Sequence, residues 1–236
     1  MSTINVRQDI LQRSLALCGV AAPILFIATF TVLGMFRDDY SPIKHFVSEL
    51  GATGVQNAAA QNANFVVTGL LIMSFAVGLF RAIGSNKRAK IAAGLVVSTG
   101  AGLAGSGIFP GDRLPVPPEP SVSALLHYTF AGLAFLAIVS AILVFSRSLP
   151  RSEPWLTFRR YSLITGVVAS GLLVLTWLSV PSASGIPSLQ QWAGLFQRLF
   201  AVTWLLWVAV MAIRLFRLPD AIDGPSADAA GRSERQ

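Results

Sequence analysis

Six long apolar runs constrain this chain more than any other feature of its sequence. A helix needs roughly 20 mostly apolar residues to cross the hydrocarbon core of a membrane, and each run has about that length. The runs cover about Leu15–Phe36, Phe65–Ile83, Ile91–Phe109, Leu125–Phe145, Tyr161–Val180 and Trp192–Ile213. The sequence therefore predicts an all-α integral membrane protein built as a bundle of six transmembrane helices.

Composition supports the membrane class. Only 12% of the 236 residues are charged, whereas soluble domains carry about 25%, and the mean hydropathy is +0.63. The net charge of +7 comes from Lys and Arg residues that lie between the apolar runs, with no basic patch interleaved with aromatic residues. We therefore expect membrane lipid as a partner and no nucleic acid.

The distribution of basic residues predicts the orientation. Fourteen of the 18 Lys and Arg residues fall in the termini and the even-numbered connections, which lie on one side of a six-span protein. The positive-inside rule then places both termini in the cytoplasm. The first run lacks a small-x-small cleavage site before Asp38, so it is interpreted as a span of an inner-membrane protein. The predicted parts are a cytoplasmic N-terminus (1–14), a six-span domain (15–217) and a disordered cytoplasmic tail (218–236).

The stretch Ser41–Gly51 follows the first run and is the densest group of reactive side chains in the chain. Ser41 suits an N-cap, Pro42 the first helical position and Gly51 a helix end. The stretch therefore predicts a short helix of about two turns on the outer side. Residues at i, i+3 and i+4 share one helical face, and three reactive side chains have that spacing: His45, Ser48 and Glu49.

More polar groups fall at the same predicted end of the bundle. His45, Glu49, Asp112 and His127 are candidates for acid–base catalysis. We predict that the remaining members of a ligand-binding pocket are Ser48, Asn64, Gln197 and Arg198. Because Arg198 lies about six residues inside its helix, roughly 9 Å deep, we expect it to pair with Glu49 or Asp112 unless its side chain snorkels to the headgroups.

Several kinds of chemistry remain open. His45, His127 and Asp112 are candidate metal ligands, although no His-x-x-x-His or Cys pair accompanies them. Ser48 and Ser41 are alternative candidate nucleophiles without a Gly-x-Ser-x-Gly elbow, and Ser41 also suits an N-cap. The sequence identifies no cofactor. The preferred interpretation is an outer-facing polar pocket that binds a lipid or small amphiphile. The alternative is a membrane-embedded hydrolase or transferase for a lipid-like substrate, and another membrane protein is a further candidate partner.

Several motifs, in this order, resemble one known family. They are His45-Phe46-Val47-Ser48-Glu49-Leu50-Gly51, Asn64 with Gly69-Leu70-Leu71, Phe109-Pro110-x-Asp112, His127-Tyr128 and Gly194-Leu195-Phe196-Gln197-Arg198. Together they resemble the six-helix prokaryotic membrane family called domain of unknown function 998, over about residues 15–215. The resemblance implies a six-helix bundle and no established activity. A fainter likeness, to membrane-embedded zinc hydrolases of the alkaline ceramidase and progestin-receptor group, lacks the late His-x-x-x-His of that group.

Overall fold

The computed structural model describes residues 3–82, 86–113, 119–149, 151, 155–181 and 185–217, with side chains from residue 10 onward. These residues form helices and no strands. The helices are α1 (Thr3–Met35), η1 (Val47–Gly51), α2 (Ala58–Ala82), α3 (Lys87–Ile108), α4 (Val122–Ser148), α5 (Trp155–Leu178), α6 (Pro187–Gln190) and α7 (Ala193–Arg217). The predicted tail, 218–236, lies outside the described residues.

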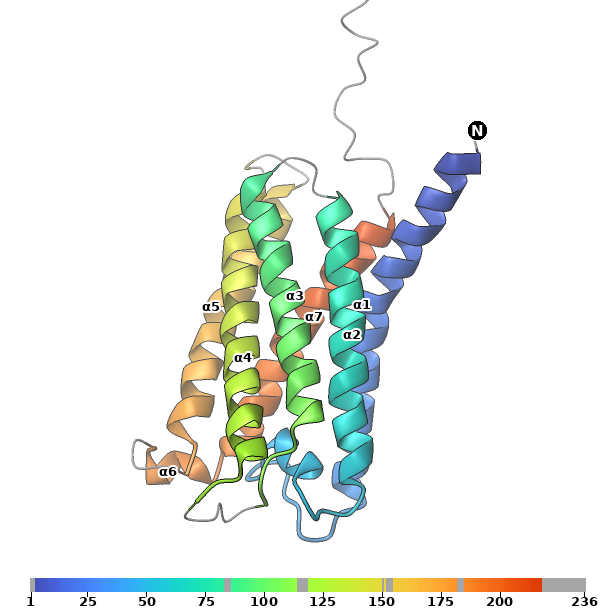
Figure 1. Cartoon of the computed structure of the whole chain (residues 1–236). Coiled ribbons are helices and arrows are strands. Elements are labelled where there is room, and N and C mark those ends of the chain that lie inside the picture. The colour runs from blue at the N-terminus through green and yellow to red at the C-terminus, as the bar shows by residue number, and fades with distance from the viewer. Residues whose placement is uncertain are drawn as a thin grey trace, which may run out of the picture.

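Six of these helices are long and apolar enough to cross a membrane: α1, α2, α3, α4, α5 and α7. The shortest, α3, has 22 residues, which at 1.5 Å per residue is about 33 Å and spans a hydrocarbon core of about 30 Å. The predicted all-α six-helix bundle is thus confirmed. Figure 1 shows η1 and α6 at one end of the bundle, opposite the N-terminus.

The six long helices form a ring. Each packs mainly against its two neighbours in the order α1, α2, α3, α4, α5 and α7, and contacts between α7 and α1 close the ring. The largest fully buried side chains lie between the helices, among them Phe75, Ile138, Phe200 and Trp207. The short helix η1 contacts α1, α2 and α7, so it covers part of the ring at its own end.

Glycines set the close packing of α3, as its small residues predict. A Cβ on Gly100 would lie 2.5 Å from the carbonyl oxygen of Gly69 in α2, and a Cβ on Gly102 would lie 2.7 Å from the carbonyl oxygen of Phe130 in α4. Neither distance leaves room for a methyl group. Helix α3 therefore approaches both neighbours at backbone contact.

Candidate functional site

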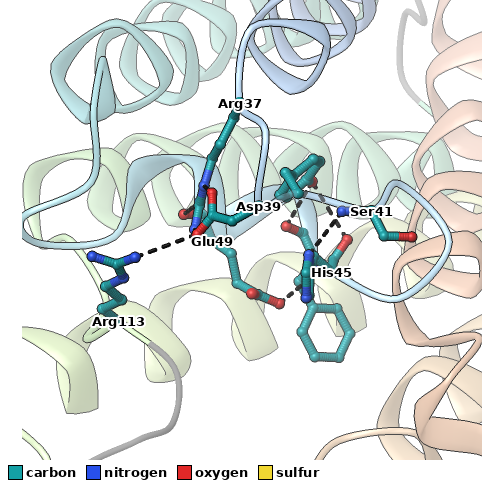
Figure 2. Close-up of polar contacts among 8 residues, drawn as sticks. Arg37, Asp39, Ser41, His45, Glu49 and Arg113 are labelled. Atoms are coloured by element: carbon teal, nitrogen blue, oxygen red, sulfur yellow. Dashed lines mark hydrogen bonds and ion pairs between the residues drawn. The ribbon is translucent and has the colours of Figure 1, made fainter.

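The segment between α1 and α2, residues 36–57, is called the η1 segment below. The predicted two-turn helix over Ser41–Gly51 is wrong in its first half, because only Val47–Gly51 is helical, as a 3₁₀ turn. The backbone N–H of Ser41 donates to Nδ1 of His45 at 2.9 Å, which closes a separate turn before η1 (Figure 2). Phe46 then has an extended backbone, φ −62° and ψ 151°. His45 therefore does not share a helical face with the residues of η1.

Two side chains satisfy the free backbone N–H groups at the start of η1. Glu49 accepts from the N–H of Phe46 at 2.7 Å, and Oε1 of Gln197 in α7 accepts from the N–H of Val47 at 2.6 Å. Burial raises the pKa of Glu49 above its ordinary value, although the Phe46 N–H and the guanidinium of Arg37 oppose that shift. Gln197 therefore ties η1 to α7 across the ring.

Arg198 has a different role from the predicted one. Its Nη1 donates to the carbonyl oxygens of Pro42 at 2.6 Å, His45 at 2.8 Å and Gly194 at 3.0 Å, and its Nη2 donates to the hydroxyl of Tyr40. The ion pairs within the described part of the chain all involve Asp39. The predicted direct pairing of Arg198 with a carboxylate is wrong, because backbone carbonyls of the η1 segment occupy its donors.

Asp39 joins two segments at this end of the bundle. It pairs with Arg37 at 2.7 Å and with Arg113, which follows α3, at 3.3 Å (Figure 2). The hydrogen bond from Arg37 is the largest of the effects that lower the pKa of Asp39 to about 2. The N–H of Thr53 also donates to the carbonyl oxygen of Gly111 at 2.9 Å. These contacts hold the η1 segment against the residues that follow α3.

A cavity of about 420 Å³ lies between η1 and the long helices, inside the η1 end of the bundle. Its apolar wall includes aromatic residues from α1, α2, α4, α5 and α7. They are Phe26, Phe65, Phe135, Trp177 and Trp204. Its polar members come from η1, from the residue range after α3, and from α3, α4, α5 and α7. They are Ser48, Glu49, Ser106, Asp112, His127, Tyr128, Thr176 and Gln197.

The structure brings together some of the predicted site residues and separates others. Those that line the cavity are Ser48, Glu49, Asp112, His127 and Gln197. Those outside its lining are His45, Asn64 and Arg198. The amide of Asn64 instead donates to the carbonyl oxygen of Phe26 at 3.3 Å, which joins α2 to α1. Binding and catalytic roles for the five lining residues stay predictions.

His127 is 3% exposed and has a fixed orientation. Its Nδ1 lies 2.8 Å from the carbonyl oxygen of Ser106 and 2.9 Å from that of Phe109. Because carbonyl oxygens only accept, Nδ1 carries the hydrogen, and in the neutral ring Nε2 then has the free lone pair. Nε2 has no hydrogen-bond partner among the described residues. The ring therefore presents an acceptor in the wall of the cavity.

Asp112 holds the start of α4. Its carboxylate accepts from the backbone N–H of Ser121 at 2.8 Å and from the hydroxyl of Ser121 at 2.7 Å. Ser121 in turn caps α4 by accepting from the N–H of Ala124. A carboxylate has about four acceptor positions, so Asp112 keeps acceptor capacity toward the cavity.

The predicted metal ligands do not assemble. Within the described ranges, no group of three His, Cys, Asp or Glu side chains lies close enough to hold a metal ion. His127 and Asp112 line the cavity, but His45 does not. The candidate set of His45, His127 and Asp112 is therefore not one site in this structure.

The aromatic wall was missed at the sequence level. Trp177 and Trp204 belong to apolar runs in which aromatic residues are common, so no local pattern separates them from residues that face lipid. Tyr128 gave a weak signal, because it follows His127 directly at the start of the fourth apolar run.

A model of the family described as "Protein of unknown function (DUF998)" matches residues 20–214. The chain belongs to the DUF998 family. The match extends from within α1 to near the end of α7 and contains every residue that lines the cavity. No curated protein and no solved structure matches the chain. This chain is therefore a multi-pass membrane protein of the DUF998 family.

Proposed function

We propose that this DUF998 protein binds a lipid or another amphiphile in the cavity between η1 and the long helices. The arrangement of the wall carries the proposal: the polar residues lie at the η1 end, and the apolar residues Phe26, Phe135 and Trp204 lie further into the bundle along α1, α4 and α7. Ligand pockets commonly measure about 300–1,000 Å³ and combine an apolar lining with a few placed polar groups. An amphiphile has the same division, with a polar headgroup and an apolar tail.

One polar atom without a partner supports a ligand in this cavity. Nε2 of His127, a residue in the cavity lining, has no hydrogen-bond partner among the described residues. Polar groups inside proteins are nearly always hydrogen-bonded. A bound molecule with a hydrogen-bond donor would satisfy this nitrogen.

The side chains around the cavity indicate a route from the lipid. Tyr128 of α4 and Trp177 of α5 line the cavity, yet they are 46% and 44% exposed. On adjacent membrane helices, exposed surface faces lipid or the headgroup region. We therefore place the entrance between α4 and α5, near the membrane surface, where a lipid molecule can enter sideways.

The same proposal includes an orientation. Basic residues are concentrated at the end of the bundle opposite η1, for example Lys87, Arg88 and Lys90 at the start of α3. The positive-inside rule places that end in the cytoplasm. The cavity then faces the outer leaflet of the cell membrane.

A membrane-embedded hydrolase or transferase is the second candidate. One observation favours it: Nε2 of His127 presents a lone pair to the same cavity that Glu49 and Asp112 line. An imidazole and a carboxylate in one site can act as general base and general acid. Turnover of a lipid by the purified protein that stops in His127→Asn, with binding retained, would establish this function.

Filling the cavity tests the binding proposal. Gly132 lines the cavity, and a Cβ there would meet no heavy atom within 4 Å. The Cβ of Gly132→Leu therefore fits without a clash, and the rest of the side chain takes up cavity volume. Gly171 in α5 also has open space around a Cβ but lies outside the cavity lining, so Gly171→Leu is the matched control. Native mass spectrometry should show co-purified lipid on the wild type and the control but not on Gly132→Leu. Equal lipid retention by all three proteins would refute the proposal.

A further inference from the structure

The charged groups of the cavity wall are of one sign. Glu49 and Asp112 line the cavity, and no Lys or Arg is among the described residues that do so. The lone pair on Nε2 of His127 adds a third acceptor. Charged headgroups bind most strongly to a partner of opposite charge, so this wall suits a cation that donates hydrogen bonds.

The guanidinium groups at this end of the bundle bind other partners. Arg37 pairs with Asp39 and donates to the carbonyl oxygen of Glu49 at 2.9 Å. Arg113, next to Asp112 in the sequence, also pairs with Asp39. Arg198 donates to carbonyl oxygens of the η1 segment and to Tyr40. None of these side chains lines the cavity. A phosphate or carboxylate headgroup in the cavity would therefore face two carboxylates without a cationic partner.

Two aromatic residues of the lining are next in sequence to its polar members. Phe46 directly precedes η1, which contains Glu49, and Tyr128 follows His127. The faces of aromatic rings attract ammonium groups, with an interaction that strengthens when water is excluded. The same rings give an anionic headgroup no such attraction.

We infer that the ligand of this cavity is a cationic amphiphile, whose protonated amine lies at the end of the cavity lined by Glu49, Asp112 and His127 and donates hydrogen bonds there. This inference rests on the proposed function, because it names the headgroup of the amphiphile. The apolar tail lies among the aromatic residues of the deeper wall. The amine is a point cation with up to three donors and no acceptor, which suits a wall that offers two carboxylates and the Nε2 lone pair.

Three amphiphiles of equal chain length test the inference: dodecylamine, dodecanol and dodecyl phosphate. Each is added at the same mole fraction to the purified full-length protein in a non-ionic detergent at pH 7, where an alkyl amine is protonated. Bound ligand is counted by native mass spectrometry. We expect dodecylamine to bind about tenfold more tightly than dodecyl phosphate, the effect of one charge-assisted hydrogen bond. Dodecanol should fall between them.

Two neutral variants connect the preference to the wall. Glu49→Gln keeps an oxygen that can accept from the Phe46 N–H, and Asp112→Asn keeps one for Ser121. Each should weaken dodecylamine binding about tenfold and leave dodecanol binding within about twofold. Ser121→Ala is the control, because it removes the hydroxyl hydrogen bond to Asp112 without removing a charge, and it should keep the preference for the amine.

The possible outcomes distinguish a failure of the cationic-headgroup inference from a failure of the amphiphile-binding proposal. Binding of dodecyl phosphate as tight as that of dodecylamine overturns the cationic headgroup and leaves amphiphile binding intact. An amine preference that survives in both Glu49→Gln and Asp112→Asn also overturns it. No binding of any of the three amphiphiles refutes the binding function itself. If neither variant folds, the wild-type ranking of the three headgroups decides.

Discussion

Replacing Arg198 with Ala tests how the η1 segment is held to α7. The change removes donors to the carbonyl oxygens of Pro42 and His45 and to the hydroxyl of Tyr40. A hydrogen bond from a charged group contributes about 1.5–3 kcal/mol net, and water can reach part of this site. We therefore expect Arg198→Ala to lower the free energy of unfolding by about 2–4 kcal/mol. Arg198→Lys should recover less than half, because one ammonium does not reproduce the guanidinium fork.

Double-mutant cycles identify the partner of Arg198. With Tyr40→Phe, the coupling energy should be about 1 kcal/mol, as for residues in direct contact. With Glu49→Gln, the two changes should add within about 0.5 kcal/mol, because no ion pair joins these residues. The free energy is measured by unfolding with sodium dodecyl sulfate in mixed micelles. Recovery of more than about 1 kcal/mol in Arg198→Ala/Glu49→Gln would show that a carboxylate is the partner after all.

Three further predictions concern packing, pH and topology. Gly194→Ala should destabilise the protein by about 1–3 kcal/mol in the same assay, because its Cβ would lie 2.2 Å from the carbonyl oxygen of His45. Burial holds the pKa of His45 below its ordinary value of 6.5, and Ser41 donates to the neutral ring, so stability should fall as the pH drops below 6.5, and this fall should be smaller in His45→Asn. In a background without Cys18, a cysteine at position 85 should react with an impermeant thiol reagent only from the cytoplasmic side. Reaction from outside would reverse the proposed orientation.

The sequence predicted the architecture well because hydrophobic length is a local property. Each apolar run of about 20 residues has one stable solution in lipid, a helix that satisfies its own backbone. The boundaries were less accurate: α2 begins at Ala58 rather than near Phe65. The polar residues before Phe65 looked like a loop, but Gln61 and Asn64 are buried in the bundle, where contacts with other helices outweigh their polarity.

The site was predicted in part. Glu49, Asp112 and His127 were placed at one end by topology alone, and all three line the cavity. The partners of Arg198 in the η1 segment could not be predicted, because the carbonyl oxygens of Pro42 and His45 lie more than 150 positions earlier in the chain. Spacing also failed for His45, since its ring nitrogen takes the Ser41 N–H and ends the turn. The spacing of residues does not show when a side chain replaces the backbone as the hydrogen-bond partner of an N–H group.

Photo-crosslinking tests the central claim, that an amphiphile occupies the cavity, most directly. A dodecylamine analogue with a diazirine near the end of its tail is added to the protein in native membranes, irradiated and mapped by mass spectrometry. We expect labelled peptides to carry the modification at deep wall residues such as Phe135 and Trp204, and Gly132→Leu to abolish it. Labelling confined to exposed apolar residues such as Ile24 and Val32, unchanged in Gly132→Leu, would contradict the claim.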